Sequence, residues 1–288
     1  MAVGVDNGGT WIRLKGLDAQ GRCIWSLRKS SPTVEKLPAF LHQHLKRWRG
    51  QLAGLAVGSR GIWKQAKRRA LRRALADLAK RVIVMSDVEA AWLAAFDPHP
   101  VADSDHPLPK GRGHTAVGLL PEGEGGRRPD EGIIVISGTG SIAYGRTRSG
   151  AYARAGGLGP DKGDEGSGYW IGREWLLRNG KKISKRYTVR KIASVAPKVL
   201  SSARKKNPIA CQIVEEAQEH LARLVIQLVW ELRFKRTAVS WAGSVLQDPT
   251  FRRGFFQTLK PLSVHPKPPA VDSATALARS IIGQHAQR

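Results

Sequence analysis

The chain has 288 residues, and its 48 lysines and arginines against 23 acidic residues give a net charge of +25. Hydrophobic residues make up 41% and charged residues 25%, a globular balance that excludes wholesale disorder. No apolar run approaches the ~18 residues of a membrane-spanning helix, and the first residues do not resemble a signal peptide. Cys23 and Cys211 are too far apart in sequence to indicate a disulfide scaffold or a cysteine metal site. We therefore expect a soluble, cytoplasmic α/β protein.

The high positive charge has two interpretations. A basic surface attracts phosphate groups without sequence recognition, which favours nucleic-acid binding. The basic residues are spread over the whole chain, however, and Arg69, Arg72 and Arg73 share one helical face opposite an apolar stripe. The sequence contains no RNA-recognition motif or zinc finger. We therefore favour solvated helix faces, and nucleic-acid binding stays an alternative that the sequence does not favour.

The first half of the sequence predicts an α/β unit. Short apolar or alternating segments joined by turn residues predict a β-meander at residues 2–6, 11–17 and 22–27. Helices and strands then alternate, at residues 34–47, 52–57, 65–80, 82–85 and 88–96. We assign residues 1–97 to an N-terminal α/β lobe.

Residues 98–131 interrupt this pattern. The stretch 97–131 holds six prolines and six glycines, which predicts an inserted loop or linker. Three histidines and two aspartates within it lack the spacing of a metal site, so a solvated loop is the better interpretation.

The second half restarts as the first did and predicts a C-terminal α/β lobe over residues 132–271. Its predicted strands and helices are 132–137, 142–146, 169–177, 209–234 and 237–241. In the longest helix, apolar positions from Ile213 to Trp230 recur near helical spacing. A terminal helix within residues 272–288 is expected to pack back on the N-terminal lobe.

Three strand–turn units carry glycine and hydroxyl residues at their tips, at residues 6–10, 137–141 and 241–244. Glycines at such turns let the backbone approach an anion and direct amide N–H groups toward it. One such turn is weak evidence, since hairpins use glycine for geometry alone. Two of them in successive lobes are better explained by a phosphate chain held from both sides. The GxxxxGK[ST] phosphate loop is absent from the sequence.

Asp87 stands where an apolar strand ends and a helix begins, a place where a carboxylate faces a binding site at the end of a sheet. Aspartate is also a common N-cap for a helix. The sequence context alone leaves the catalytic and the capping interpretations open.

These motifs resemble the N-acetylglucosamine kinase and BadF/BadG/BcrA/BcrD-type ATPase family of the actin–hexokinase–Hsp70 superfamily. The matching segments, in family order, are residues 5–10, 86–91, 136–141, 156–159, 163–172 and 242–245. GTGS alone is a weak signal, but GTGS followed by GGxG and GDEGSxYWIG is highly specific. The resemblance implies two ribonuclease-H-like lobes of the actin-like ATPase type, with a nucleotide cleft between them.

The resemblance also implies a role for each matched residue. Asp6 would hold Mg²⁺, and Asp87 would be the base that accepts a proton from a sugar hydroxyl. The implied nucleotide-binding residues are Gly8, Gly9, Thr10, Gly138, Thr139, Gly140, Ala193, Gly243 and Ser244. The implied substrate-binding residues are Thr33, Asp87, Gly157, Leu158, Gly159 and Asp164. ATP and Mg²⁺ are the expected cofactors.

The chain departs from the family pattern at a few positions. Asn7 replaces a common glycine, a mild change because asparagine tolerates positive φ. Thr33 stands where N-acetylglucosamine kinases place an asparagine, and Leu158 where they can carry tryptophan. Both changes touch the sugar site, so ATP use is the firmer expectation. Arg60 is either a contact for an anionic substrate group or a surface arginine.

We expect an ATP-dependent kinase that phosphorylates an amino sugar or a related hexose, with homodimer formation left open. The alternative is a BadF/BadG-type ATPase that couples ATP hydrolysis to a partner protein without a sugar. Such activators hold an iron–sulfur cluster through cysteines of the second lobe, and neither Cys23 nor Cys211 is placed like that pair. A basic, nucleic-acid-associated protein with a vestigial nucleotide fold ranks last.

Overall fold

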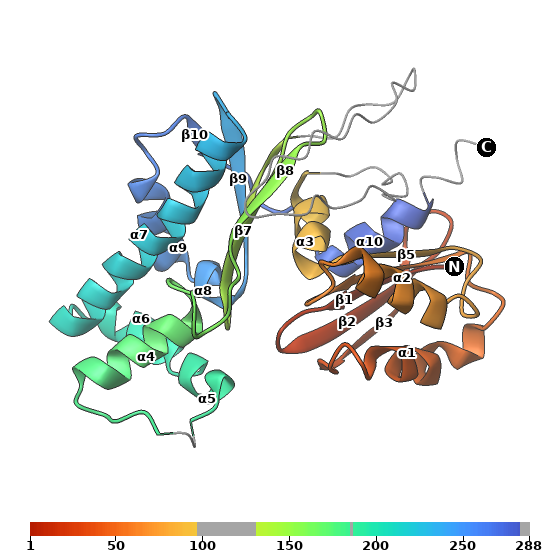
Figure 1. The fold of residues 1–288 in the computed structure, drawn as a ribbon, viewed down its shortest axis with the longest axis horizontal. Helices are drawn as coiled ribbons and strands as arrows, with labels where there is room; N and C mark the ends of the chain where they lie inside the picture. Colours follow the sequence, from red (N-terminus) through yellow and green to blue (C-terminus); the bar gives the residue numbers. More distant parts are fainter. Residues whose placement is uncertain (97–130, 185–186, 283–288) are drawn as a thin grey trace. The chain divides into compact units, whose positions relative to one another are not determined.

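The computed structural model describes residues 1–96, 131–184 and 187–282. It divides into two compact units, which are described one at a time (Figure 1). In the described part of the chain, unit 1 contains residues 1–96 and 269–282, and unit 2 contains residues 131–268. The predicted insert at 98–131, with its histidines, lies almost wholly outside the described residues.

Unit 1 contains a five-stranded mixed sheet with the strand order β3-β2-β1-β4-β5. Its strands are β1 (Ala2–Asn7), β2 (Trp11–Leu17), β3 (Cys23–Ser30), β4 (Gly54–Ser59) and β5 (Val82–Ser86). The first three form an antiparallel meander, and β1, β4 and β5 are parallel. Asn7 pairs with Ser59 and Ser59 with Ser86, so the three parallel strands end at one edge of the sheet.

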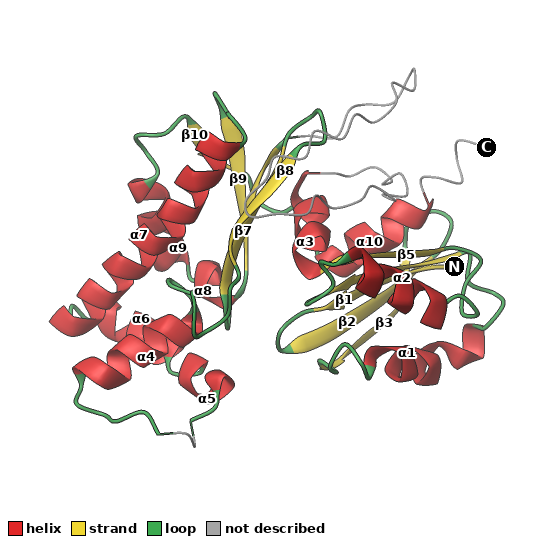
Figure 2. Ribbon diagram, viewed as in Figure 1, coloured by secondary structure: helices red, strands yellow, loops and turns green. Residues whose placement is uncertain are grey.

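Helices cover both faces of this sheet (Figure 2). They are α1 (Leu37–Leu45), followed by a 3-10 turn (Lys46–Trp48), α2 (Gln65–Ala74), α3 (Asp87–Phe96) and α10 (Ser273–Ile282). Val3 and Val5 face the apolar core that includes residues of α1 and α2. On the opposite face, a Cβ on Gly4 would overlap the Ala274 carbonyl, and one on Gly58 would lie 2.6 Å from the Ala90 Cβ. Glycine at these positions lets α10 and α3 lie directly on the strands.

Unit 2 repeats the topology of unit 1, with the strand order β10-β9-β6-β7-β8. Its strands are β6 (Gly132–Ser137), β7 (Ser141–Arg146), β8 (Tyr152–Gly156), β9 (Thr237–Ala242) and β10 (Val264–Pro266). The strands β6, β7 and β8 form an antiparallel meander, and β6, β9 and β10 are parallel. The predicted division into two α/β lobes of similar construction therefore has a direct counterpart in the sheets.

The long helix α7 forms the centre of the unit 2 core. The helices of the unit are α4 (Gly168–Arg178), α5 (Val189–Ala193), α6 (Ala196–Arg204), α7 (Pro208–Glu231), α8 (Ser244–Gln247) and α9 (Pro249–Thr258). Ile213, Ala217 and Leu221 of α7 are buried, as their spacing predicts. Trp230 does not belong to this stripe: it follows Leu228 by only two residues, and is 76% exposed. No helix among the described residues is long and apolar enough to span a membrane.

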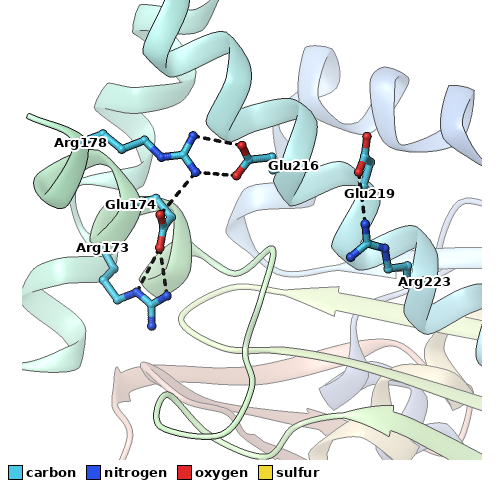
Figure 3. A network of polar contacts seen from close by, with 6 residues as sticks. All are labelled: Arg173, Glu174, Arg178, Glu216, Glu219 and Arg223. Carbon is cyan, nitrogen blue, oxygen red and sulfur yellow. Dashed lines mark hydrogen bonds and ion pairs between the residues drawn. The ribbon is translucent and has the colours of Figure 1, made fainter.

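Ion pairs connect α4 to α7 (Figure 3). Arg178 binds Glu216 through Nη1 and Nη2, at 3.1 and 2.6 Å, and also contacts Glu174 of its own helix. A fork-to-fork pair of this kind sets the relative orientation of two helices. It therefore helps to hold α4, whose first turn carries part of the candidate site in unit 2.

Candidate active site

The β1–β2 turn of unit 1 is connected to the neighbouring strand and loop through Asn7. The Asn7 Nδ2 donates to Ser59 Oγ at 3.0 Å, and its Oδ1 accepts from Ser31 Oγ at 2.7 Å. Ser31 Oγ also lies 2.7 Å from the Gly8 carbonyl. Asn7 is fully buried and does not adopt positive φ. The expectation that asparagine is accepted here for its φ is therefore wrong: its amide is used for hydrogen bonds that join three segments.

Asp87 is the first residue of α3, and the capping of that helix is done by its neighbours. The Glu89 amide donates to Ser86 Oγ at 3.2 Å, and the Ser86 amide donates to Glu89 Oε2 at 2.8 Å. This reciprocal pair is a capping box. The N-cap interpretation of Asp87 is therefore wrong. The S-x-x-E signal for it was present in the sequence.

The surroundings of the Asp87 carboxyl raise its pKa from 3.8 to about 7. Burial is the largest cause, and the nearby charge of Asp6 adds to it. Hydrogen bonds from the amides of Val88 and of Asp87 itself, and the charge of Arg60, act in the opposite direction. A carboxyl with a pKa near neutrality is suited to accept a proton at physiological pH.

A buried arginine holds the helix start that carries Asp87. Arg68 of α2 binds both carboxylate oxygens of Glu89, with Nη2 2.6 Å from Oε2 and Nη1 3.2 Å from Oε1. Its Nε donates to the Ile62 carbonyl at 3.1 Å. The side chains of Arg68 and Glu89 are 6% and 20% exposed. This arrangement was not recognised from the sequence, because its partners lie on different elements.

Asp6 lies near the end of β1 and is a suitable ligand for a magnesium ion. Its Oδ2 lies 3.3 Å from Arg13 Nη1, and its side chain is 14% exposed. Burial raises the pKa of Asp6 to about 6, against the lowering effect of Arg13. No group of three or more potential metal ligands occurs among the described residues. One or two carboxylates completed by phosphate oxygens and water are the usual Mg²⁺ environment in phosphoryl-transfer sites, so Asp6 suits the ion.

The loop that carries Thr33 is attached to the β1–β2 hairpin. The Ser31 amide donates to the Thr10 carbonyl at 3.1 Å. Thr33 is exposed, and its side chain hydrogen-bonds to Glu35. The pKa of Glu35 is lowered by a hydrogen bond from its own amide first, then by Thr33, with Lys67 and Arg60 also contributing. Ser31, two residues before Thr33, therefore holds this loop against the hairpin of the predicted phosphate-binding residues.

In unit 2, the hairpin at residues 138–140 is held from one side by the start of α4. The amides of Gly168 and Tyr169 donate to the carbonyls of Gly138 and Thr139, at 2.7 and 3.3 Å. Ser141 Oγ donates to the Glu165 carbonyl at 2.8 Å. The hairpin that was predicted to bind phosphate is thus fixed to the segment that follows it in the family pattern.

Asp164 lies beside this hairpin. Its side chain is buried, and its Oδ1 accepts from the Ser141 amide at 3.2 Å. A Cβ on Gly140 would lie 2.9 Å from Asp164 Oδ2, so glycine allows the carboxylate to approach. Burial raises the pKa of Asp164, the Ser141 amide lowers it, and Glu165 raises it further. The structure gives Asp164 a role in holding the turn, and its predicted contact with a sugar stays a prediction.

The predicted adenosine motif packs against the same hairpin. Gly243 has φ of 89°, and a Cβ on it would overlap the Ser137 carbonyl and lie 2.9 Å from the Gly138 amide nitrogen. A Cβ on Gly168 would lie 3.5 Å from the Ala193 carbonyl oxygen. Predicted nucleotide-binding residues far apart in sequence are therefore neighbours within unit 2.

The predicted sugar wall, residues 157–159, follows β8. The Gly157 amide donates to the Ser141 carbonyl at 2.9 Å, which places the wall next to the hairpin. Leu158 is 63% exposed, and its Cβ would lie 3.2 Å from a Cβ on Gly163. The wall and the loop before α4 are thus adjacent.

The model of the BadF/BadG/BcrA/BcrD ATPase family matches residues 123–269, which is half of the chain. The chain belongs to this family. An N-acetylmuramic acid/N-acetylglucosamine kinase of Clostridium acetobutylicum is 32% identical over 157 residues, covering 43% of this chain and 51% of the relative. An N-acetyl-D-glucosamine kinase of Dictyostelium discoideum is 51% identical over 45 residues, covering 16% and 14%. The matches thus span about half the length of the first curated relative and less of the second.

Solved structures confirm the fold. A candidate N-acetylglucosamine kinase of Chromobacterium violaceum has a TM-score of 0.69 and 21% identity, and the match covers 97% of this chain and 98% of that one. At this level of identity the likeness concerns the fold alone. Together with the repeated topology of the two sheets, it confirms the predicted fold class of two ribonuclease-H-like lobes of the actin-like ATPase type.

Proposed function

We propose that this member of the family is an ATP-dependent kinase that transfers the γ-phosphate to a hydroxyl of an amino sugar or a related hexose. The observation that carries the proposal is Asp87, a partly buried carboxyl with pKa near 7 that the capping box leaves out of helix capping. The names of the curated relatives, both amino-sugar kinases, support it.

In the proposed reaction Asp87 accepts the proton of the acceptor hydroxyl while that oxygen forms a bond to the γ-phosphorus. The bond from that phosphorus to the bridging oxygen breaks, and ADP leaves. Such transfer depends on positioning and charge neutralisation more than on a strong base. The ion pair between Arg68 of α2 and Glu89 of α3 would hold Asp87 in position for this step.

Asp6 is the residue that we propose for Mg²⁺, and the ion would neutralise charge on the phosphates of bound ATP. The residues that we propose for the phosphates are Gly8, Gly9, Thr10, Gly138, Thr139 and Gly140. Ala193, Gly243 and Ser244 would contact adenosine, since small residues leave room for it. Thr33, Asp164 and residues 157–159 would contact the sugar.

The alternative, an ATPase that drives a partner protein, is favoured by the description of the matching family as ATPases. Its iron–sulfur form is not supported by the cysteines. Cys23 is exposed at the start of β3, and Cys211, near the start of α7, lies 3.5 Å from the Ala203 carbonyl oxygen. Homodimer formation and a cytoplasmic location stay predictions.

The experiment that separates the two functions is ATP consumption with Mg²⁺ across a sugar panel. The panel contains N-acetylglucosamine, glucosamine, N-acetylmannosamine, N-acetylmuramic acid and glucose. Turnover that depends on one of these sugars and disappears in Asp87→Asn supports the kinase. Turnover that no sugar changes would contradict the kinase and favour a protein partner.

A further inference from the structure

Arg60 is the first residue after β4, at the sheet edge where the parallel strands of unit 1 end. Its amide donates to the Asn7 carbonyl at 3.2 Å. Its Nη1 donates to the Gly9 carbonyl at 3.0 Å, so the side chain lies against the β1–β2 hairpin. A guanidinium has five N–H donors in a planar fork, and one bond to a carbonyl does not use them up.

Arg60 lies at the same sheet edge as Asp87, because Ser59 and Ser86 pair at the ends of the parallel strands β4 and β5. Its charge reaches both Asp87, the proposed base, and Glu35, whose carboxylate is hydrogen-bonded to Thr33. Arg60 is partly exposed, so a ligand can approach it. The chain thus has a cationic side chain at the sheet edge that carries Asp87, and its charge also acts on the carboxylate that is hydrogen-bonded to Thr33.

We propose that Arg60 recognises a carboxylate on the acceptor, which makes acidic amino sugars or sugar acids the preferred substrate class. This inference rests on the proposed kinase function. A carboxylate matches the guanidinium fork, and such charge-assisted pairs are among the stronger hydrogen bonds. A singly charged carboxylate also fits this place better than a doubly charged phosphate, since Asp87 and Glu35 already lie within reach of the arginine charge.

The test compares two acceptors that differ in one anionic group, N-acetylglucosamine and N-acetylmuramic acid, which carries a lactyl carboxylate. Arg60→Gln should raise KM for the acidic sugar roughly tenfold to a hundredfold, the effect of one lost charge-assisted hydrogen bond. KM for the neutral sugar should change by less than about twofold. Arg60→Lys should recover part of the loss, because it keeps the charge without the fork. Lys64→Gln, at an exposed basic position before α2, is the matched control and should leave both values unchanged.

Each other outcome has a defined meaning. An equal loss with both sugars would overturn the proposal and would leave Arg60 as a residue that positions the hairpin through Gly9. Transfer to the neutral sugar with no preference for the acidic one, in wild type and variant alike, would overturn it while the kinase function stands. A wild-type protein that phosphorylates no sugar would overturn both.

Discussion

Replacing Asp87 with asparagine should stabilise the protein while it removes the proposed base. The pKa of Asp87 rises from 3.8 to about 7, mainly because of burial and then because of Asp6. The folded state therefore holds the proton more tightly than the unfolded chain, and wild-type stability falls as the pH rises between these two values. A pKa difference of one is worth ~1.4 kcal/mol, so ionising Asp87 in the folded protein costs ~4 kcal/mol at pH 8.

Asparagine has nearly the same shape as aspartate and carries no charge. Asp87→Asn should therefore raise the free energy of unfolding by up to ~4 kcal/mol at pH 8, but by only ~2 kcal/mol at pH 5, where folded wild type still holds its proton. The Val88 amide, which donates to Asp87 Oδ1 at 3.1 Å, keeps an acceptor in the variant. Urea unfolding at both pH values, in EDTA and without nucleotide, measures the difference.

Asp18→Asn is the matched control. Asp18 is an aspartate whose pKa is lowered, first by a hydrogen bond from the Arg22 amide, so its ionised form stabilises the fold above the unfolded pKa. This variant should lose stability at pH 8 and approach wild type as the pH falls. An Asp87→Asn gain that is absent at pH 8, or equal at both pH values, would refute the account of Asp87 as a carboxyl that burial and Asp6 keep protonated.

The remaining predictions concern the parts that position the site. Glu89→Gln should lower the free energy of unfolding by ~3 kcal/mol and should also lower kcat, because Arg68 stays buried without its charge partner. Urea unfolding measures the loss, and unchanged stability would contradict this prediction. Gly243→Ala should lower the free energy of unfolding by ~2–4 kcal/mol, because the position has positive φ and a Cβ would overlap the Ser137 carbonyl. Gly159→Ala should lower it by only ~1 kcal/mol, because this position also has positive φ, 88°, but nothing lies within 4 Å of the added Cβ. Equal costs would contradict the close packing at Gly243. Activity with saturating Mg²⁺ should rise with pH as Asp87 loses its proton, and a pH-independent kcat would exclude it as the base.

Local patterns in the sequence were sufficient for the α/β class and for most of the elements. The predicted helix at 209–234 corresponds to α7, and the turns with glycine at their tips are real turns. The predicted helix at 65–80 ends instead at Ala74, because Ala79 already pairs with Leu52 beside the sheet. The strands β8 and β10 and the helices α5 and α6 were not predicted. These elements are short, or contain glycine or proline, so each shows too few repeats of a hydrophobic pattern to be recognised in the sequence.

The connections that shape the candidate site could not be predicted, because they join residues far apart in the sequence. Arg68 and Glu89 lie on different helices, and Gly243 packs on a turn about one hundred residues earlier. The role of Asn7 depends on Ser31 and Ser59 together. The capping box at Ser86 is the exception, since its spacing is visible in the sequence.

The central claim, that a phosphoryl group is transferred to a sugar with Asp87 as base, is tested most directly by identifying the products. Wild-type protein, Asp87→Asn and Asp18→Asn are incubated with ATP, Mg²⁺ and each sugar, and ADP and sugar phosphate are quantified by phosphorus NMR. Wild type and Asp18→Asn should each give equal amounts of ADP and sugar phosphate, and folded Asp87→Asn should give neither product. ADP without sugar phosphate, or an undiminished product rate in Asp87→Asn, would contradict the claim.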